Sequence, residues 1–217
     1  MGLYLRSAWW TARDIIGKRN LVFFQAMPPA DEPIPSPAFR ILTSHDGLHA
    51  ARDILPSFDF LSPGRQADYA RRLAAGHHVV LVADMLGVAL SWGWVTPPAS
   101  TPPAVPWEWN AELRVPAQTG YLWDFFTSFL ARRQGFYRAL LGHAVRACRI
   151  SGAERVLVYC RRENKASRAA IGQAGFAEAG RVTLSRVGPV YCARSQLACG
   201  LALSRTPIPL SRFLLLC

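Results

Sequence analysis

The sequence predicts an α/β (α+β) domain in which apolar strands alternate with amphipathic helices. The run from Asp124 to Leu141 passes from an apolar strand through a basic turn that contains glycine, and then into a helix with one apolar face. A second, shorter helix is expected at 164–174, opened by a capping asparagine and closed by Gly-Phe. The length of 217 residues and the hydrophobic content of 51% suit one well-buried domain and exclude a disordered or fibrous chain.

The N-terminal region is expected to stand apart from this domain. Residues 1–20 mix tryptophan and leucine with arginine and lysine, which predicts either a basic helix at a membrane surface or a helix packed on the domain or on a second subunit. Charged residues interrupt its apolar positions, so we expect no cleavable signal peptide. Five prolines within residues 28–37 predict an extended linker. The chain is therefore divided into 1–37 (helix and linker), 38–200 (domain) and 201–217 (tail).

The first half of the domain predicts a strand, two helices and a hairpin. Ser62 as N-cap, Pro63 at the first helical position and Gly76 after the last turn mark the second helix. Two apolar, β-branched runs flank a short turn at 84–87, which predicts a buried hairpin rather than a membrane span. The expected elements are a strand Phe39–Leu42, a helix near Gly47–Leu55 with Ser44 as N-cap, a helix Gly64–Ala75, and strands His78–Ala83 and Val88–Val95.

The second half begins with a proline-rich stretch, Pro97–Pro106, which predicts an exposed loop because proline disfavours both strand and helix interiors. A third strand is expected around Glu112, after Trp107 and Trp109. The remaining expected elements are a strand Gly120–Ser128, the helix that ends at Gly152, a strand Arg155–Cys160, the helix 164–174, and a strand pair within Val182–Ala193 with its turn at 187–189.

Composition excludes some partners without choosing one. The net charge of +11 attracts anions, but all except two of the 25 basic residues are arginines scattered along the chain, so nucleic acid is not the expected partner. The five cysteines form no C-x-x-C pair, and their odd number fits a reducing cytoplasm. His45 and His49 stand four residues apart without further ligands nearby, so we expect no zinc site.

The basic turn before the long helix predicts an anion site. The first turn of a helix leaves backbone N–H groups without partners, and its dipole favours negative charge. Arg132, Arg133 and the amides from Gln134 to Arg138 are therefore placed to hold a pyrophosphate.

Together the turn and the second helix resemble the GNAT superfamily of acetyl-CoA-dependent N-acetyltransferases. In that family the turn has the form Q/R-x-x-G-x-G/A, and Arg132, Gly135 and Tyr137 fall on its three defined places, with Tyr137 standing where the family has Gly or Ala. The resemblance extends over Phe39 to Gln196 and is specific between Tyr121 and Phe176.

The second helix departs from the family at one place. Ile171 stands seven residues after Asn164, where many members carry a tyrosine thought to protonate the leaving thiolate. The resemblance leaves that proton to Tyr159, Tyr191 or water. Cys160 is expected to be a small buried hydrophobe rather than a nucleophile, because no histidine is placed by sequence to activate it.

The resemblance implies a fold and a cofactor. The expected sheet is twisted and mostly antiparallel, with about six to seven strands, a splayed central parallel pair and flanking helices. The cofactor would be acetyl-CoA or a related acyl-CoA, without a metal. The residues expected to bind it are Phe126, Thr127 and Ser128 at pantetheine, Arg132, Arg133, Gln134, Gly135, Phe136, Tyr137 and Arg138 at phosphate, and Asn164 and Ser167 at the far edge, with Asn164 equally interpretable as a helix cap.

Asp124 is the expected general base. It lies three residues before Thr127, beside aromatic residues whose packing would desolvate the carboxylate and raise its pKa. The alternative is a carboxylate that neutralises a neighbouring arginine, and Glu112 is the reserve base. Tyr191 completes the set of candidate catalytic residues.

The function expected from the resemblance is N-acetyl transfer, or short-acyl transfer, from acyl-CoA to a primary amine by direct attack in a ternary complex. Trp92, Trp94, Trp107 and Trp109 suggest either an aromatic wall for an amino-sugar or envelope-precursor acceptor, or simply a core. The alternatives are an acyl-CoA-binding or membrane-docking module without turnover, and a nucleic-acid binder. We expect a cytoplasmic protein and leave open a homodimer and contact of residues 1–20 with the inner face of the membrane.

Overall fold

The computed structural model describes residues 16–27, 39–42, 63–84, 86, 89–99, 104–106, 112–187, 190–197, 202–204 and 213–216. Its helices are α3 (Pro63–Ala74), α4 (Phe136–Ile150), α5 (Lys165–Gln173) and the short 3₁₀ helix η2 (Phe129–Ala131). Its strands are β1 (Ile16–Ala26), β2 (Phe39–Leu42), β3 (His78–Ala83), β4 (Ala89–Thr96), β5 (Ala104–Pro106), β6 (Glu112–Arg114), β7 (Thr119–Thr127), β8 (Arg155–Arg161), β9 (Ala177–Val187), β10 (Val190–Leu197), β11 (Ala202–Ser204) and β12 (Phe213–Leu216).

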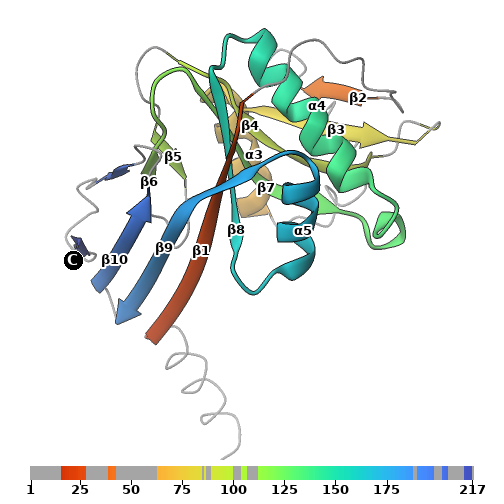
Figure 1. Cartoon of the computed structure of the whole chain (residues 1–217). Helices are drawn as coiled ribbons and strands as arrows, with labels where there is room; N and C mark the ends of the chain where they lie inside the picture. Colours follow the sequence, from red (N-terminus) through yellow and green to blue (C-terminus); the bar gives the residue numbers. More distant parts are fainter. Residues whose placement is uncertain are drawn as a thin grey trace, which may run out of the picture.

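One large sheet organises the fold (Figure 1). Nine strands follow the order β12-β10-β9-β1-β8-β7-β4-β3-β2, and all neighbours are antiparallel except the pairs β7/β8 and β10/β12. Strands β5, β6 and β11 form a separate small antiparallel sheet. The predicted fold class is confirmed: a mostly antiparallel sheet with a central parallel pair and flanking helices. The described part of the chain has nine strands in this sheet, where about six to seven were expected.

Strand β1 corrects the expected N-terminal organisation. It pairs with β8 on one side and with β9 on the other, so it lies inside the sheet. Its successive side chains alternate between the two faces, and Leu21 and Phe23 are buried on one face while Val22 and Phe24 are buried on the other. Residues 16–26 are therefore a strand of the domain, and the predicted boundary at 38 is wrong. Residues 1–15 and the predicted linker lie outside the described residues.

Most other local predictions are confirmed. Helix α3 begins at Pro63 as predicted, and β3 and β4 form the predicted hairpin. The proline-rich loop is corrected at its end, because Ala104–Pro106 is a short strand paired with β6. The predicted helix near Gly47–Leu55, and Trp107 with Trp109, lie outside the described residues. No helix in the ranges that the structure describes is long and apolar enough to cross a membrane.

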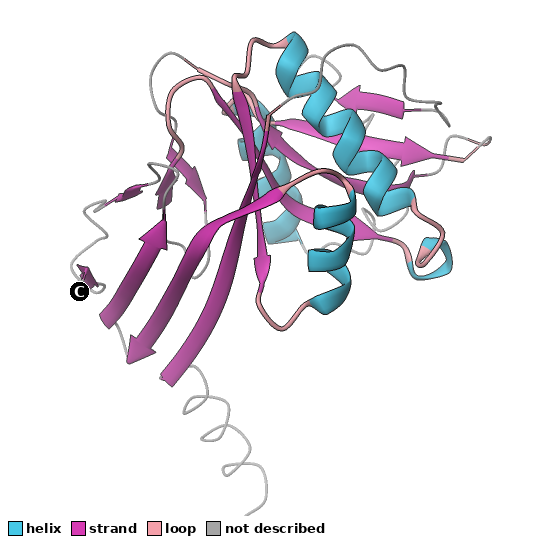
Figure 2. Cartoon of the chain, in the orientation of Figure 1, coloured by secondary structure: helices cyan, strands magenta, loops and turns pink. Residues whose placement is uncertain are grey.

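The sheet separates two hydrophobic cores, and different helices cover them. In Figure 2 helices α4 and α5 lie on the near face of the sheet and α3 lies behind it. The apolar face of α4 packs on one core through Leu140, Leu141 and Ala144. On the other face, Leu73 of α3 packs with buried side chains that include Trp94 and Tyr121. Side chains of one strand therefore have different neighbours according to the face of the sheet from which they project.

The parallel pair β7/β8 is joined along only part of its length. Paired residues run from Thr119 and Arg155 to Leu122 and Val158, whereas β7 continues to Thr127 and β8 to Arg161. On its other side β7 pairs with β4, and that register shifts next to Asp124, whose φ of 54° is left-handed. This is a β-bulge, which bends a strand and re-aims its side chains. The two strands thus separate near the bulge.

Close packing of β7 on α4 gives a stability test. A Cβ added at Gly120 would lie 2.5 Å from Cys148 Sγ and 2.8 Å from its Cβ. We expect Gly120→Ala to lower the free energy of unfolding by about 1–3 kcal/mol, because a filled core resists added volume. Chemical denaturation measures this change.

Gly172→Ala is the matched control, because a Cβ at that helical position meets nothing within 4 Å. It should be neutral or should stabilise by up to about 1 kcal/mol. Equal effects of the two substitutions would contradict the packing of Gly120 against α4.

Candidate functional site

A left-handed turn connects the end of β7 to α4. After η2 the backbone turns through Arg133, with a φ of 64°, and Gly135, with a φ of 83°, before the helix begins at Phe136. Glycine adopts the latter conformation without strain. The turn is followed directly by the first backbone amides of α4, and the first turn of a helix leaves its N–H groups without helical partners. The helix start predicted after the basic turn is therefore present in its expected place, and anion binding there stays a prediction.

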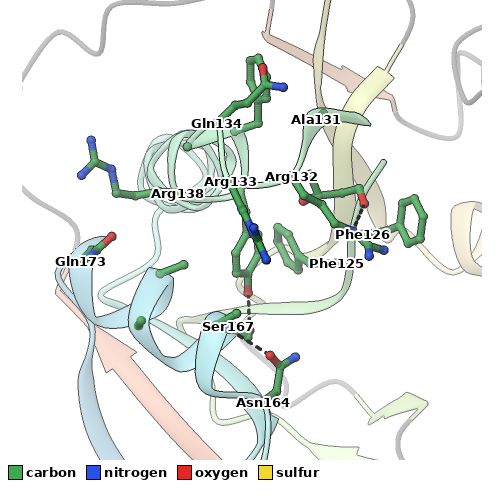
Figure 3. Close-up of a pocket in the computed structure, with 17 residues that line it drawn as sticks. Phe125, Phe126, Ala131, Arg132, Arg133, Gln134, Arg138, Asn164, Ser167 and Gln173 are labelled. Atoms are coloured by element: carbon green, nitrogen blue, oxygen red, sulfur yellow. Dashed lines mark hydrogen bonds between the residues drawn. The ribbon is translucent and has the colours of Figure 1, made fainter. Parts of the chain in front are cut away.

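Side chains of the turn hold its shape and supply positive charge. Arg132 Nε donates to the Thr127 carbonyl oxygen at 3.3 Å, and its guanidinium carbon lies 5.5 Å from the ring centroid of Phe129. Gln134 Nε2 donates to the Leu130 carbonyl oxygen at 2.7 Å. In Figure 3 the Arg133 side chain reaches over the space between α4 and α5, whereas Arg138 points outward from α4.

The turn opens into a pocket of about 900 Å³ between β7, α4 and α5. The structure brings eleven of the twelve predicted cofactor-binding residues into its lining, with Ser128 as the exception. Phe125, Ala131, Ala166, Ala169, Ala170 and Gln173 also line the pocket and were not predicted. The small side chains of Ala166, Ala169 and Ala170 leave room beside α5. The spacing of these alanines in the sequence could have predicted that they face a ligand.

The start of α5 lies at the far side of the pocket. Asn164 Oδ1 accepts a hydrogen bond from the Ser167 backbone N–H at 3.0 Å, so the helix-cap interpretation is confirmed. Asn164 also lines the pocket, and its cap role does not conflict with contact to a ligand. Ile171, seven residues after Asn164, is fully buried in the core and offers no proton donor.

Tyr137 crosses the pocket from α4 to α5. Its hydroxyl lies 3.2 Å from Ser167 Oγ, and its ring packs edge-on against Phe125 with centroids 5.8 Å apart. Burial raises the pKa of Tyr137 to about 12, so the phenol stays protonated near neutral pH. The sequence identified Tyr137 as a departure from the turn pattern but gave no sign of its partner on α5.

Asp124 faces the opposite side of the sheet. Arg72 of α3 donates to Asp124 Oδ2 at 2.7 Å and also pairs with Asp68 at 2.7 Å, and its guanidinium lies 4.5 Å from the ring centroid of Trp123. The Asp124 side chain is 57% exposed. The desolvation that we expected around this carboxylate is therefore absent, and the alternative of a carboxylate paired with an arginine is present. Sequence reasoning missed Arg72, because nothing local links a position on α3 to the bulge in β7.

His77 and Tyr159, on the same side of the sheet, are neutral near neutral pH. Burial, followed by the positive charge of Arg72, lowers the pKa of His77 to about 4. The Nδ1 atom of His77 shares a 3.1 Å hydrogen bond with the Thr96 hydroxyl. Burial, followed by the Asp124 charge, raises the pKa of Tyr159 to about 12. Tyr159 stacks on Phe23 and so lies on the α3 face, away from the lining of the pocket.

Two further candidates lie on other strands. Glu112 is on β6 in the small sheet, and Tyr191 is on β10, with β9, β1 and β8 between that strand and β7. At about 4.8 Å between neighbouring strands, the backbone of Tyr191 lies about 19 Å from β7. Their catalytic roles stay predictions.

The burial of Trp92, Trp94 and Cys160 decides what these side chains can do. Trp92 and Trp94 are 4% and 0% exposed, so they belong to the core rather than to an open aromatic wall. Burial raises the pKa of the Cys160 thiol, which disfavours a thiolate nucleophile. Within the described ranges no group of three His, Cys, Asp or Glu side chains is placed to hold a metal ion.

Comparisons with known proteins give the following matches. Residues 50–176 match the model of the acetyltransferase (GNAT) family. The structure is similar to a GNAT-family acetyltransferase from Colwellia psychrerythraea, with a TM-score of 0.55 and 13% identity over 85% of this chain and 62% of that one. It is similar to a candidate GNAT-family acetyltransferase from Novosphingobium aromaticivorans, with a TM-score of 0.50 and 12% identity over 78% of this chain and 64% of that one.

The chain thus spans less than two thirds of the length of either protein, and such identities show the fold alone. No curated protein matches the sequence.

The turn predicts specific stabilisation by an anion. Inorganic pyrophosphate at about 100 times its Kd should raise the melting temperature by about 5–10 °C. The double variant Arg132→Glu/Arg133→Glu should lose this gain, because it reverses the charge beside the free amides. Thermal melts with and without pyrophosphate measure the difference.

Arg194→Glu is the control, because this exposed arginine lies on β10 and outside the lining of the pocket. Stabilisation that persists in the double variant, or that Arg194→Glu removes equally, would place the anion elsewhere.

Proposed function

The chain belongs to the acetyltransferase (GNAT) family, and from this premise we propose that it moves an acetyl or short acyl group from acyl-CoA to a primary amine. One observation carries the proposal. The pocket is lined by the basic turn and the start of α4 together with residues 125–127 at the end of β7, beyond its pairing with β8, so a long carrier has both a place for its charge and a path to the sheet.

The proposed placement of CoA follows the charge of the pocket. The diphosphate would lie on the amides that open α4, with Arg132 and Arg133 beside it. The pantetheine arm would run along the end of β7, past Phe126 and Thr127, with Asn164 and Ser167 across from it. The thioester would then lie near the bulge at Asp124.

The proposed reaction is direct attack in a ternary complex. The amine nitrogen bonds to the thioester carbonyl carbon, the C–S bond breaks, and its electron pair stays on sulfur, which takes up a proton. The described residues that line the pocket include no Asp, Glu, His or Lys, and the base that we propose acts from beyond this lining. Asp124 is proposed for this role, because its carboxylate lies at the bulge where the two strands separate and is open to water.

The acceptor is proposed to approach from the α3 face. Arg72, the Asp124 carboxylate and the edge of the aromatic core lie together there, which gives both charge and apolar surface. An amino-sugar acceptor remains a prediction. Trp92 and Trp94 do not support it, because they are buried.

A module that binds acyl-CoA without turnover is the second candidate. A specific observation favours it: the place where family members carry a proton-donating tyrosine is a fully buried Ile171. Both candidates bind CoA, and only the enzyme consumes acyl-CoA.

The first test is a screen for CoA release with acetyl-CoA and a longer acyl-CoA. Amino sugars, nucleotide sugars, peptides and polyamines serve as acceptors. We expect acceptor-dependent release with at least one class. Tight CoA binding with no release from any class would favour the module.

Asp124→Asn separates catalysis from charge neutralisation. If Asp124 accepts the proton of the amine, the variant should lose about 10²–10⁴-fold in kcat while its affinity for CoA is unchanged. The matched control is Asp68→Asn, which removes the other carboxylate bound to Arg72 but lies on α3. Steady-state kinetics and CoA titrations of both variants measure the two effects. Equal losses of kcat in both variants would show that Asp124 only balances the charge of Arg72.

A further inference from the structure

Tyr137 lies where four elements meet around the gap between β7 and β8. Its ring packs against Phe125 of β7, and its hydroxyl shares a hydrogen bond with Ser167 of α5. Cys160 of β8 belongs to the buried cluster against which Tyr137 packs. Since Tyr137 itself belongs to the first turn of α4, one side chain links α4 to β7 and to α5.

The gap is the stretch of β7 and β8 beyond their last paired residues, Leu122 and Val158. Beyond these residues Phe125 and Cys160 lie on the α4 face of their strands, and the ring of Tyr137 packs against Phe125 on that face. The Tyr137 side chain therefore lies beside the part of β7 that no longer pairs with β8.

Tyr137 also differs from every other tyrosine whose side chain the structure describes. Tyr69, Tyr121 and Tyr159 belong to the core on the α3 face. Tyr137 alone among these four lines the pocket. A small residue at this position would lack both the ring that packs on Phe125 and the hydroxyl that bonds Ser167.

We propose that Tyr137 controls entry of the carrier's arm: the pantetheine and its acyl group enter the gap only when the Tyr137–Ser167 hydrogen bond opens and the ring swings aside. This inference rests on the proposed function. The nucleotide end of the carrier binds at the turn whether the gap is open or closed. Tyr137 thereby sets which thioesters reach the Asp124 side.

Removal of the Tyr137–Ser167 hydrogen bond is expected to strengthen CoA binding. When only an open fraction of molecules admits a ligand, the apparent Kd equals the intrinsic Kd divided by that fraction. One neutral hydrogen bond contributes modestly to the closed state, so its removal should tighten CoA binding about two- to tenfold. A residue that contacts the bound arm would give the opposite sign.

The test compares two ligands by calorimetry: CoA, and the same nucleotide diphosphate without its pantetheine arm. Tyr137→Phe removes the hydroxyl and keeps the ring. Ser167→Ala removes its partner and keeps the backbone N–H that caps α5. Both variants should bind CoA about two- to tenfold more tightly and the armless nucleotide as the wild type does. Tyr121→Phe, a fully buried position on the α3 face, is the control and should change neither affinity.

The remaining outcomes overturn the inference. Weaker or unchanged CoA binding in both variants shows that the hydrogen bond does not hold the gap closed. An equal gain for both ligands places the effect at the phosphate turn rather than in the gap. Failure of the proposed function looks different: neither the wild type nor either variant would bind CoA at all.

Discussion

The partial pairing of β7 with β8 is the constraint on which the site depends. Two parallel neighbours normally share an evenly spaced ladder of hydrogen bonds. Here the paired residues end at Leu122 and Val158, and β7 has a bulge at Asp124 in its pairing with β4. The chain leaves β7 through η2 and a left-handed turn, and α4 then returns over the gap. The same separation that opens the sheet thus places a helix start, with its free amides, at the mouth of the opening.

The two faces of the sheet divide the chemistry between them. The α4 and α5 face has the pocket, its arginines and its hydroxyl groups. The α3 face has the Asp124 carboxylate, held by an arginine that also serves Asp68. In the proposed reaction a thioester bound on the first face meets an amine on the second through the gap. The proposed role of Tyr137 concerns this step, whereas the arginines concern the charge of the carrier.

Local signals in the sequence predicted the elements that local chemistry determines. Pro63 starts α3, Gly135 sits at the left-handed step before α4, and Asn164 caps α5, as their backbone preferences require. Contacts between segments far apart in the chain could not be predicted from the sequence. Strand β1 pairs with strands more than a hundred residues away in the sequence. Without those partners in view, its basic and apolar residues were equally compatible with a helix at a surface. The ion pair of Arg72 with Asp124 joins residues 52 positions apart and likewise leaves no local trace.

Amide hydrogen exchange with and without CoA tests the central claim most directly, because it reports where the carrier lies. The account predicts that CoA slows exchange at residues 126–138 and 164–167, which surround the turn, the end of β7 and the start of α5. It predicts little change in β9 and β10, which lie beyond β1 in the sheet. Slowed exchange confined to other strands, or no change with CoA at saturating concentration, would contradict the account.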